Sequence, residues 1–596
     1  MYILGIACFY HDSAAALLKD GELVAAAMEE RFTRKKHDNS FPKHAIEFCL
    51  RQAGITGADL EYTVFYEKSL VKFERILLTT LNTFPRSGDV WRDAMTNWLK
   101  EKLWVKNIIQ KEVGVRYDRV LFADHHMSHA ASAFFASPFR EAAVLTVDGV
   151  GEWTTTTLGV ARSTWEGDAP GGKNELNLFE EQRFPHSIGL LYSAFTAYLG
   201  FRVNNGEYKV MGMAPYGTPR YVDKVEKLFK QDADGSFRLN MDYFSYHYST
   251  ENTYNQKFVD LFGSPRPAES DFFTMATNPE RAGEKAAMDL NQHYADIAAS
   301  IQRVTEDALI KICNHLYEKT GMKKLVMAGG VALNTKANYR LLAETPFEEI
   351  YIQPAAGDDG GALGAALWAH HLVLNKPRKW VMPHAYWGEE YSDADIHAFL
   401  DGKGAKYTDY AGRDSEMLDM LAENITREKI VGFFQGRFEW GPRALGSRSI
   451  IADPRSEAMK EVVNSKIKFR EPFRPFAPVI LRDRAAEYFD YPGVQEHEAP
   501  RYMLMVAPIK PEKQDQLQAV CHMGTGRLQT IEREINPRYY GVIERFGQIT
   551  GVPVLLNTSF NLRGEPIVSS PRDAWNTFNN SDIDILVLGT CVVHKP

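Results

Sequence analysis

Two histidines and two aspartates have the types and spacing that suit a metal site. His125 and His129 stand four residues apart in the run DHHMSH, and on a helix such residues share one face, where two imidazoles can bind one metal. Asp148 and Asp358 lie in two acidic turns and would add oxygen ligands if the fold brings those turns together. This set suits Fe(II), Mn(II) or Zn(II) rather than a closed thiolate site. The structural alternative is a polar helix start with histidines at an interface.

A basic cluster in the last third of the chain is the second candidate site. Residues 437–474 hold nine Lys or Arg against five Asp or Glu, a balance of +4 in a chain whose net charge is −8. Arg443 and Arg448 lie in a Gly-flanked turn of this cluster, and arginines on stiff turns suit multidentate phosphate binding. We therefore predict an anion pocket, the alternative being a solvated charged face.

Two later segments fit the same pocket. Residues 524–527 offer glycine amides and the guanidinium of Arg527. The predicted strand 552–556 runs into a polar turn, 557–561, that suits an adenine or a ribose. Polar residues at strand ends are also ordinary caps, so each segment alone carries little weight.

The elements that must position these residues begin with a repeated unit. Residues 2–9 and 13–18 are predicted strands joined by a turn that holds His11, and an Asp-Gly hairpin leads to a third strand, 23–28. Strand, acidic turn and strand recur at 142–160. The repeat predicts an internally duplicated α/β fold, the alternative being two unrelated hairpins.

Further along, the chain shows a nucleotide-type pattern and then a break. A predicted strand, 324–327, runs into the turn that holds Gly329 and Gly330. Strand, glycine turn and helix is how α/β proteins bring backbone N–H groups against a nucleotide. The pattern breaks between Leu372 and Asp395, where we place the boundary between two domains, 1–380 and 381–596.

Composition excludes several classes of protein. The chain has 596 residues, too many for one core, and its 44% hydrophobic and 24% charged residues are ordinary globular values. The charge of −8 argues against a general nucleic-acid binder. Five scattered cysteines exclude a disulfide scaffold and suit a reducing compartment. Without a signal-peptide start or an apolar run of 18 residues, we expect a cytoplasmic enzyme that binds no membrane.

Ten motifs, in order from residue 5 to residue 568, resemble those of the O-carbamoyltransferases of the nodulation-protein-U, cephamycin and tobramycin type. Together they cover nearly the whole chain and are far more specific than any one of them. They are GIACFYHDSAAALL, EERFTRKKHD, DHHMSHAASAF, TVDGVGE, YKVMGMAPYG, GGVALN, GDDGGALGAA, GPRALGSRSI, KFREPFRPFAP and LNTSFNLRGEPIV.

The resemblance implies a fold and a reaction. The N-terminal domain would be a duplicated actin-like (ASKHA) domain of the tRNA threonylcarbamoyl transferase type, and the C-terminal domain a YrdC-like α/β domain. The C-terminal domain would make carbamoyl adenylate from carbamoyl phosphate and ATP with Mg2+, releasing pyrophosphate. The N-terminal domain would pass the carbamoyl group to a hydroxyl of a small-molecule acceptor, a natural product or a sugar.

The resemblance also implies roles for residues of the N-terminal domain. His125, His129, Asp148 and Asp358 would hold one divalent metal, with Fe2+ expected ahead of Mn2+ or Zn2+. Asp358 is preferred over its neighbour because it takes the first position of the family's Asp-x-Gly turn. At the first turn, His11 would be the base that takes the acceptor's proton. Asp12 beside it would orient the acceptor.

The implied adenylate contacts fall in both domains. Those of the N-terminal site are Lys36, Gly329 and Gly330. In the C-terminal site, Lys468 and Arg470 match the YrdC K-x-R motif, and Ser559 and Asn561 match its S-x-N motif. Further polar residues would complete the pocket: Arg443, Arg448, Arg527 and Asn557. The family often has an acidic residue between Met523 and Gly524, and its absence here puts any role of that residue in question.

Three other functions share parts of this pattern. A tRNA-modifying threonylcarbamoyl enzyme has both domain types, but the acidic chain lacks a long basic face. A hydrogenase-maturation carbamoyltransferase would need cysteine-rich zinc fingers. A non-catalytic nucleotide-binding regulator would have lost motif positions that stand here. We expect the acceptor site to be lined by 66–111 and 232–280. Within the first of these, the amphipathic stretch 70–104 suits a lid or a homodimer face, with core packing favoured.

Overall fold

The computed structural model describes residues 1–169, 171–471 and 473–595 and divides the chain into two compact units. The first consists of Met1–Val24 and Asn39–Val381, and the second of Ala25–Asp38 and Met382–Pro596. The sequence did not suggest that an N-terminal segment joins the second unit. Its side chains are bonded there: Arg31 Nη2 donates to the carbonyl of Gly441 at 2.8 Å, and Arg34 Nη2 donates to that of Pro566 at 2.9 Å.

Two five-stranded sheets dominate the first unit, and they match strand for strand. One contains β1 (Tyr2–Ala7), β2 (Ala14–Lys19), β3 (Glu22–Met28), β4 (Leu60–Phe65) and β5 (Val120–Phe122); the other contains β6 (Glu141–Val147), β7 (Thr154–Arg162), β8 (Glu175–Arg183), β11 (Lys324–Ala328) and β12 (Glu349–Tyr351). Their orders are β3-β2-β1-β4-β5 and β8-β7-β6-β11-β12. In both, the first strand runs antiparallel to the second and parallel to the fourth of its sheet. The predicted duplicated α/β fold is confirmed in this strand order.

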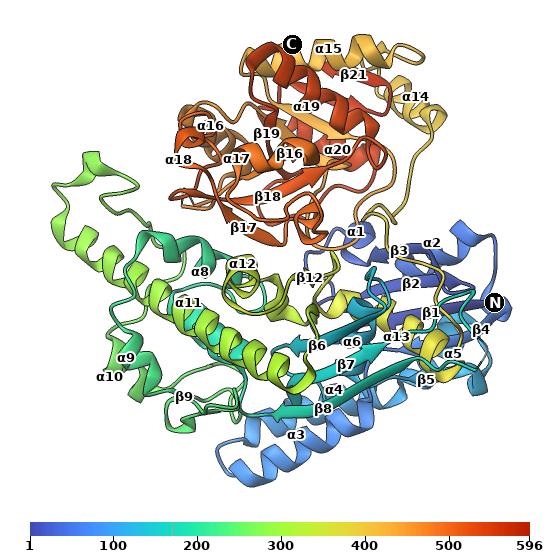
Figure 1. The fold of residues 1–596 in the computed structure, drawn as a ribbon, viewed down its shortest axis with the longest axis vertical. Helices are drawn as coiled ribbons and strands as arrows, with labels where there is room; N and C mark the ends of the chain where they lie inside the picture. Colours follow the sequence, from blue (N-terminus) through green and yellow to red (C-terminus); the bar gives the residue numbers. More distant parts are fainter. Residues whose placement is uncertain (170, 472, 596) are drawn as a thin grey trace. The chain divides into compact units, whose positions relative to one another are not determined.

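Two helices are exchanged between the sheets. Helix α6 (His125–Phe134) follows β5 of the first sheet but packs on β6 and β11 of the second, whereas α13 (Asp358–Trp368) follows β12 and packs on β1 and β2 (Figure 1). The two helices also pack on each other. Glycines allow this, because a Cβ at Gly364 would lie 1.8 Å from the carbonyl oxygen of Ser128. The exchange brings both helix starts to the same place.

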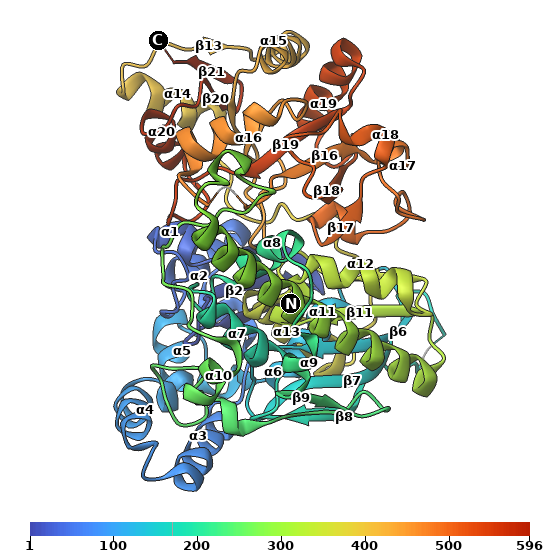
Figure 2. The same ribbon diagram turned by 90° about the vertical axis from the view of Figure 1, so that its left-hand side faces the viewer.

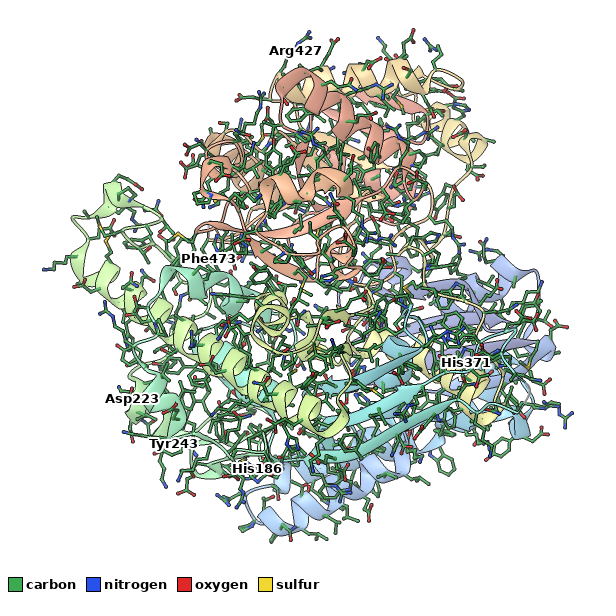
Figure 3. The ribbon with its side chains drawn as sticks, in the orientation of Figure 1. His186, Asp223, Tyr243, His371, Arg427 and Phe473 are labelled. Atoms are coloured by element: carbon green, nitrogen blue, oxygen red, sulfur yellow. The ribbon has the colours of Figure 1, made fainter. Side chains whose placement is uncertain are left out.

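The far ends of these helices are also held together. His371, which is labelled in Figure 3, lies beyond the end of α13. Its ring stacks on that of Phe135, beyond the end of α6, with centroids 4.5 Å apart. Burial lowers the pKa of His371 to about 3, so the ring is neutral. This histidine is therefore a packing residue.

Helix α3 (Ser69–Thr83) turns its polar side inward. Lys72, Arg75 and Thr80 are buried, whereas Leu70 and Leu81 are 71% and 63% exposed. This reverses the usual pattern of a surface helix. Helix α3 lies beside α4 (Gly88–Lys100), as Figure 2 shows. The core packing favoured for this stretch is therefore wrong for the leucines, and the buried cations call for another explanation.

The remaining helices of the first unit include the long α11 (Lys285–Thr320). Others are α2 (Lys43–Ala53), α5 (Val105–Val113), α7 (Ile188–Tyr198), α8 (Glu207–Met213) and α12 (Thr335–Glu344). Across the described part of the chain, no helix combines the length and the apolar character that crossing a bilayer requires.

The second unit is built on one mixed sheet of nine strands. These are β13 (Thr408–Asp409), β14 (Val431–Phe434), β15 (Arg448–Ala452), β16 (Ala477–Leu481), β17 (Met505–Pro508), β18 (Thr525–Ile531), β19 (Val554–Ser559), β20 (Ile585–Leu588) and β21 (Cys591–His594), in the order β13-β21-β20-β14-β15-β19-β16-β18-β17. Helices α15 (Asp414–Thr426) and α19 (Pro537–Thr550) pack together and contribute to its apolar core. Further helices are α14 (Asp393–Gly402), α16 (Glu457–Val463) and α20 (Pro571–Asn579).

The polar turn expected at 557–561 begins inside a strand instead. Residues 557–559 belong to β19, and residues 525–527 of the other polar segment belong to β18. Strand β19 lies between β15 and β16; its pairing with β16 reaches Asn557, and its pairing with β15 reaches Ser559. Tertiary pairing therefore overrides the local turn signal of these polar residues.

Candidate active site

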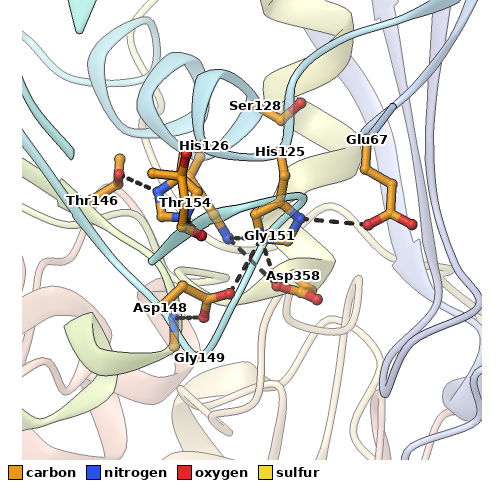
Figure 4. Close-up of polar contacts among 12 residues, drawn as sticks. Glu67, His125, His126, Ser128, Thr146, Asp148, Gly149, Gly151, Thr154 and Asp358 are labelled. Carbon is orange, nitrogen blue, oxygen red and sulfur yellow. Dashed lines mark hydrogen bonds and ion pairs between the residues drawn. The ribbon is translucent and has the colours of Figure 1, made fainter. Parts of the chain in front are cut away.

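Four side chains from three parts of the first unit converge on one point: two from α6, one from the β6–β7 turn and one from the start of α13. Figure 4 shows three of them, His125, Asp148 and Asp358. The Nε2 atoms of His125 and His129 lie 3.1 Å apart. Asp358 Oδ1 lies 3.5 Å from the first of these nitrogens and 3.4 Å from the second, and Asp148 Oδ2 lies 3.2 Å from His125 Nε2. All four residues are buried, and their ligand atoms lie within 4.8 Å of one another. The structure thus brings together the residues predicted as metal ligands.

The charge distribution of this cluster fits a cation. The Asp358 carboxylate is buried, and neither of its oxygens accepts a hydrogen bond, an arrangement that is costly without a positive partner. Burial lowers the pKa of His125, but Asp358, the hydrogen bond to Asp148 and the nearby Glu67 carboxylate outweigh it and raise the pKa well above its usual value. Two nitrogen and two oxygen donors suit a divalent transition metal, so the residues present fit such an ion.

Backbone groups fix the orientation of Asp148. Its Oδ1 accepts a hydrogen bond of 2.8 Å from the N–H of Gly330. Gly329 precedes this contact at φ +96°, and a Cβ there would lie 2.2 Å from the carbonyl oxygen of Val147. The two glycines, predicted to contact an adenylate, therefore also bring an N–H group to the candidate ligand.

Two glutamates that the sequence reasoning missed support the histidines. Glu152 Oε1 accepts from the backbone N–H of His125 at 3.0 Å, and Glu67 Oε2 lies 3.8 Å from His125 Nδ1 (Figure 4). Such outer groups orient metal-binding imidazoles. Glu152 stands in the TVDGVGE motif, which was a usable signal, whereas nothing near Glu67 marks it. His126 instead contacts Thr146 and Thr154, and burial lowers its pKa well below the usual value, so it is structural.

His11 and Asp12 occupy the β1–β2 turn, the position that Asp148 takes in the matching sheet. His11 Nδ1 lies 2.7 Å from Asp12 Oδ2, and its Nε2 lies 3.6 Å from Asp358 Oδ2. Burial lowers the pKa of His11, but Asp358, Asp12 and Asp148 outweigh it and raise the pKa to about 10. The predicted base therefore lies beside the metal-type cluster.

We expect the Asp358→Asn variant to bind a divalent metal more than about tenfold more weakly, because it loses a charged oxygen ligand. Elemental analysis after dialysis against a weak chelator measures this. Asp359→Asn is the matched control, since Asp359 is also buried but is not part of the four-residue cluster. Retention of metal in the first variant and loss in the second would reverse the choice between the two aspartates.

A second polar centre lies in the second unit, around Lys468. Its Nζ donates to Asn561 Oδ1 at 2.8 Å and to Ser559 Oγ at 3.3 Å, so the K-x-R and S-x-N motifs meet. Burial, with Arg470, Arg474 and Lys36 adding to it, lowers the pKa of Lys468 well below its usual value. So many cations at close range fit a polyanionic ligand.

Lys36, predicted to contact the adenylate in the N-terminal site, lies in the segment Ala25–Asp38 of the second unit. It is exposed and contributes to the low pKa of Lys468. Arg470 Nε donates to Asn464 Oδ1 at 3.0 Å, and its guanidinium lies 4.4 Å from the Phe476 ring centroid.

Two of the residues predicted for the nucleotide pocket are buried and form hydrogen bonds with interior groups. Arg448 is fully buried and donates to backbone carbonyls, among them that of Gln435 at 2.7 Å. Asn557 Nδ2 donates to Gln529 Oε1 at 2.6 Å and to the carbonyl of Ala444 at 3.1 Å. Their contacts give no support to nucleotide binding and make them structural. Two other residues predicted for the pocket are only partly buried: Arg443, on the loop before β15, and Arg527, on β18.

Comparison with known proteins identifies the family. The carbamoyltransferase N-terminus family model matches residues 2–367, and the carbamoyltransferase C-terminus model matches residues 422–595. The chain is 47% identical to an uncharacterized protein of Synechocystis sp., over all of this chain and 97% of that one. It is 36% identical to nodulation protein NolNO of Sinorhizobium fredii, over 98% of this chain and 79% of the relative. Nodulation protein U of Rhizobium tropici is 28% identical, with 93% and 90% covered.

The chain belongs to the carbamoyltransferase family, as the resemblance predicted. It is an enzyme that transfers carbamoyl groups. Among solved structures, HypF of T. kodakarensis matches 63% of this chain and 48% of its own at 14% identity, with a TM-score of 0.29. That score is too low to bear on the fold.

Proposed function

We propose that the protein is an ATP-dependent O-carbamoyltransferase that makes carbamoyl adenylate in the second unit and uses it in the first. In this proposal the first unit is actin-like and the second YrdC-like. The observation that carries the proposal is that each unit holds a different polar centre. The first has a buried set of metal-type ligands beside His11, and the second has a cluster of cations around Lys468.

The cationic centre suits the activating half-reaction. Carbamate is a poor electrophile and needs activation. Water would first cleave carbamoyl phosphate to carbamate and phosphate, and a carbamate oxygen would then attack the α-phosphorus of ATP and displace pyrophosphate. Lys468, Arg470 and Lys36 would hold the anionic oxygens of these substrates, together with Mg2+. Because both units are in one chain, the reactive adenylate stays at a high effective concentration.

The centre in the first unit suits the transfer half-reaction. His11 would take the proton of the acceptor hydroxyl as that oxygen attacks the carbamoyl carbon, and Asp12 would hold the imidazole through Nδ1. A divalent metal, Fe2+ ahead of Mn2+ or Zn2+, supplies a Lewis acid when bound by the four ligand residues. Its charge would offset the carboxylates that raise the pKa of His11, and so bring the pKa toward the range of a general base.

A buried arginine indicates how the acceptor is held. Arg75 on α3 is buried, and its Nη1 donates to the carbonyl of Gly151 at 2.6 Å, in the turn next to His125. Its pKa is lowered by burial, while Tyr10 and Glu67 act in the opposite direction. A buried guanidinium that has a carbonyl as its hydrogen-bond partner suits a polar or anionic group of the acceptor. The inward polar face of α3 then lines the acceptor site.

Pyrophosphate release from the full chain with ATP and Mg2+, with and without carbamoyl phosphate and with no acceptor, tests the proposal. Release that depends on carbamoyl phosphate supports it. Release that needs threonine and bicarbonate instead would point to a threonylcarbamoyl enzyme. If neither condition releases pyrophosphate, the proposal that the enzyme forms carbamoyl adenylate in the absence of an acceptor is overturned.

We expect Arg75→Ala to raise the KM for the acceptor about 10- to 100-fold, since a hydrogen bond to a charged group contributes about 1.5–3 kcal/mol. Pyrophosphate release without acceptor should stay as in the unaltered protein. Steady-state transfer assays measure the KM. The control is Arg86→Ala, since Arg86 is an exposed arginine shortly after the same helix. An unchanged KM would remove Arg75 from the acceptor site.

A further inference from the structure

Outside both centres, three metal-ligating side chains meet at the edge of the sheet in the second unit. They are His397 on α14, Asp409 on β13 and Cys591 on β21, and their ligand atoms lie within 4.8 Å of one another. Strand β13 is the first strand of the sheet and pairs with β21, which places Asp409 directly opposite Cys591. His397 and Asp409 lie between the ranges that the two family models match.

The polar atoms of this cluster are arranged to face one another. Asp409 Oδ1 accepts from the N–H of Ala411 at 2.9 Å and from Thr590 Oγ1 at 2.8 Å, which leaves Oδ2 directed to His397. The distance from that Oδ2 to His397 Nε2 is 3.1 Å, yet this buried nitrogen has no partner with hydrogen-bond geometry. Held carboxylates and unsatisfied imidazole nitrogens are features of a ligand set.

The surroundings of the cluster are acidic. Asp393 and Asp401 stand one turn before and one turn after His397 on α14, and both contribute to raising the pKa of Cys591. Burial, which is the largest cause, and Asp409 raise this pKa to about 11. The thiol is fully buried with carboxylates around it, and a cation is the kind of partner that suits such a group.

We propose that His397, Asp409 and Cys591 bind one thiolate-preferring divalent metal, of which Zn2+ is the type, in a site separate from the centre in the first unit. One sulfur, one nitrogen and one oxygen ligand suit zinc, with water as the fourth. Ligand atoms in such sites lie about 3.3–3.8 Å apart, so the cluster has to close by up to about 1 Å. Metal binding displaces the thiol proton to solvent and joins α14 and the edge strand β13 to β21, near the end of the chain.

Cobalt(II) is the probe that separates the two sites. Added to metal-free full-length protein, it should give a thiolate-to-cobalt charge-transfer band, because this cluster contains a cysteine and the four-residue set in the first unit does not. Zn2+ should displace the cobalt and abolish the band. The signal does not depend on catalysis, so its failure would leave the proposed function standing.

Variants assign the band to these residues. We expect Cys591→Ser to remove the band and the less buried cysteine, Cys521→Ser, to keep it. His397→Ala and Asp409→Asn should weaken cobalt binding at least about tenfold. Both change partly exposed residues, so they test the site even if Cys591→Ser does not fold. Cobalt binding without the band, or a band that survives in a folded Cys591→Ser or in both of the other variants, would overturn the proposal.

Discussion

Replacing Lys468 by alanine should abolish the pyrophosphate release that depends on carbamoyl phosphate, with a loss of about 10²–10³-fold. Lys468 Nζ reaches both Ser559 and Asn561, and three further cations act on it. Burial and the neighbouring cations disfavour the charged form of this amine, and phosphate oxygens are the partners that would stabilise that form. We expect the loss in the chemical step, in which Lys468 would stabilise the negative charge that develops on the phosphate oxygens.

The control for this variant is Lys466→Ala. Lys466 lies in the same short helical segment but is exposed. Equal losses in both variants would indicate a general effect of removing positive charge. Near-normal pyrophosphate release from Lys468→Ala would exclude the Lys468 centre as the adenylating site. Circular dichroism and thermal unfolding show whether each variant is folded.

His11→Ala should have the opposite effect on the two half-reactions. Transfer to the acceptor should fall about 10²–10⁴-fold, as expected when a general base is removed. Pyrophosphate release without acceptor should persist, because His11 lies in the first unit and Lys468 in the second. Separate assays of pyrophosphate and of carbamoylated acceptor measure the two effects.

Added imidazole separates a base from a structural residue. If His11 transfers a proton, free imidazole should restore part of the transfer activity of His11→Ala, with a pH dependence that follows the imidazole. Metal content is measured in parallel, because His11 Nε2 lies near Asp358. Loss of both half-reactions together would contradict the assignment of two sites.

The first sheet and the metal-type cluster were accessible to sequence reasoning for a physical reason. Local signals determine them: the hairpin at Gly21, the acidic turn at Asp148, and the four-residue spacing of His125 and His129 on a helix. Asp358 was placed through a resemblance in its motif, since no local rule distinguishes it from Asp359. The structure puts Asp358 within the cluster.

Other features depend on contacts between distant segments, which one sequence does not reveal. Glu67 follows β4, and it lies near His125 because β4 pairs with β5, the strand that precedes α6. Asn557 looked like a turn residue, but its strand lies in the middle of a sheet and its amide bridges interior groups. The inward cations of α3 had the periodicity of an ordinary amphipathic helix, in which the buried side is the apolar one.

The segment Ala25–Asp38 determines how this enzyme can be divided. Because it belongs to the second unit while the residues on both sides of it belong to the first, the chain passes between the units three times. A fragment that starts at Met382 would lack Arg31, Arg34 and Lys36. Chimaeras that exchange halves between relatives at one junction would inherit a mismatched segment. The two halves are therefore expected to evolve, and to be engineered, as a pair, with residues 25–38 transplanted along with the C-terminal part.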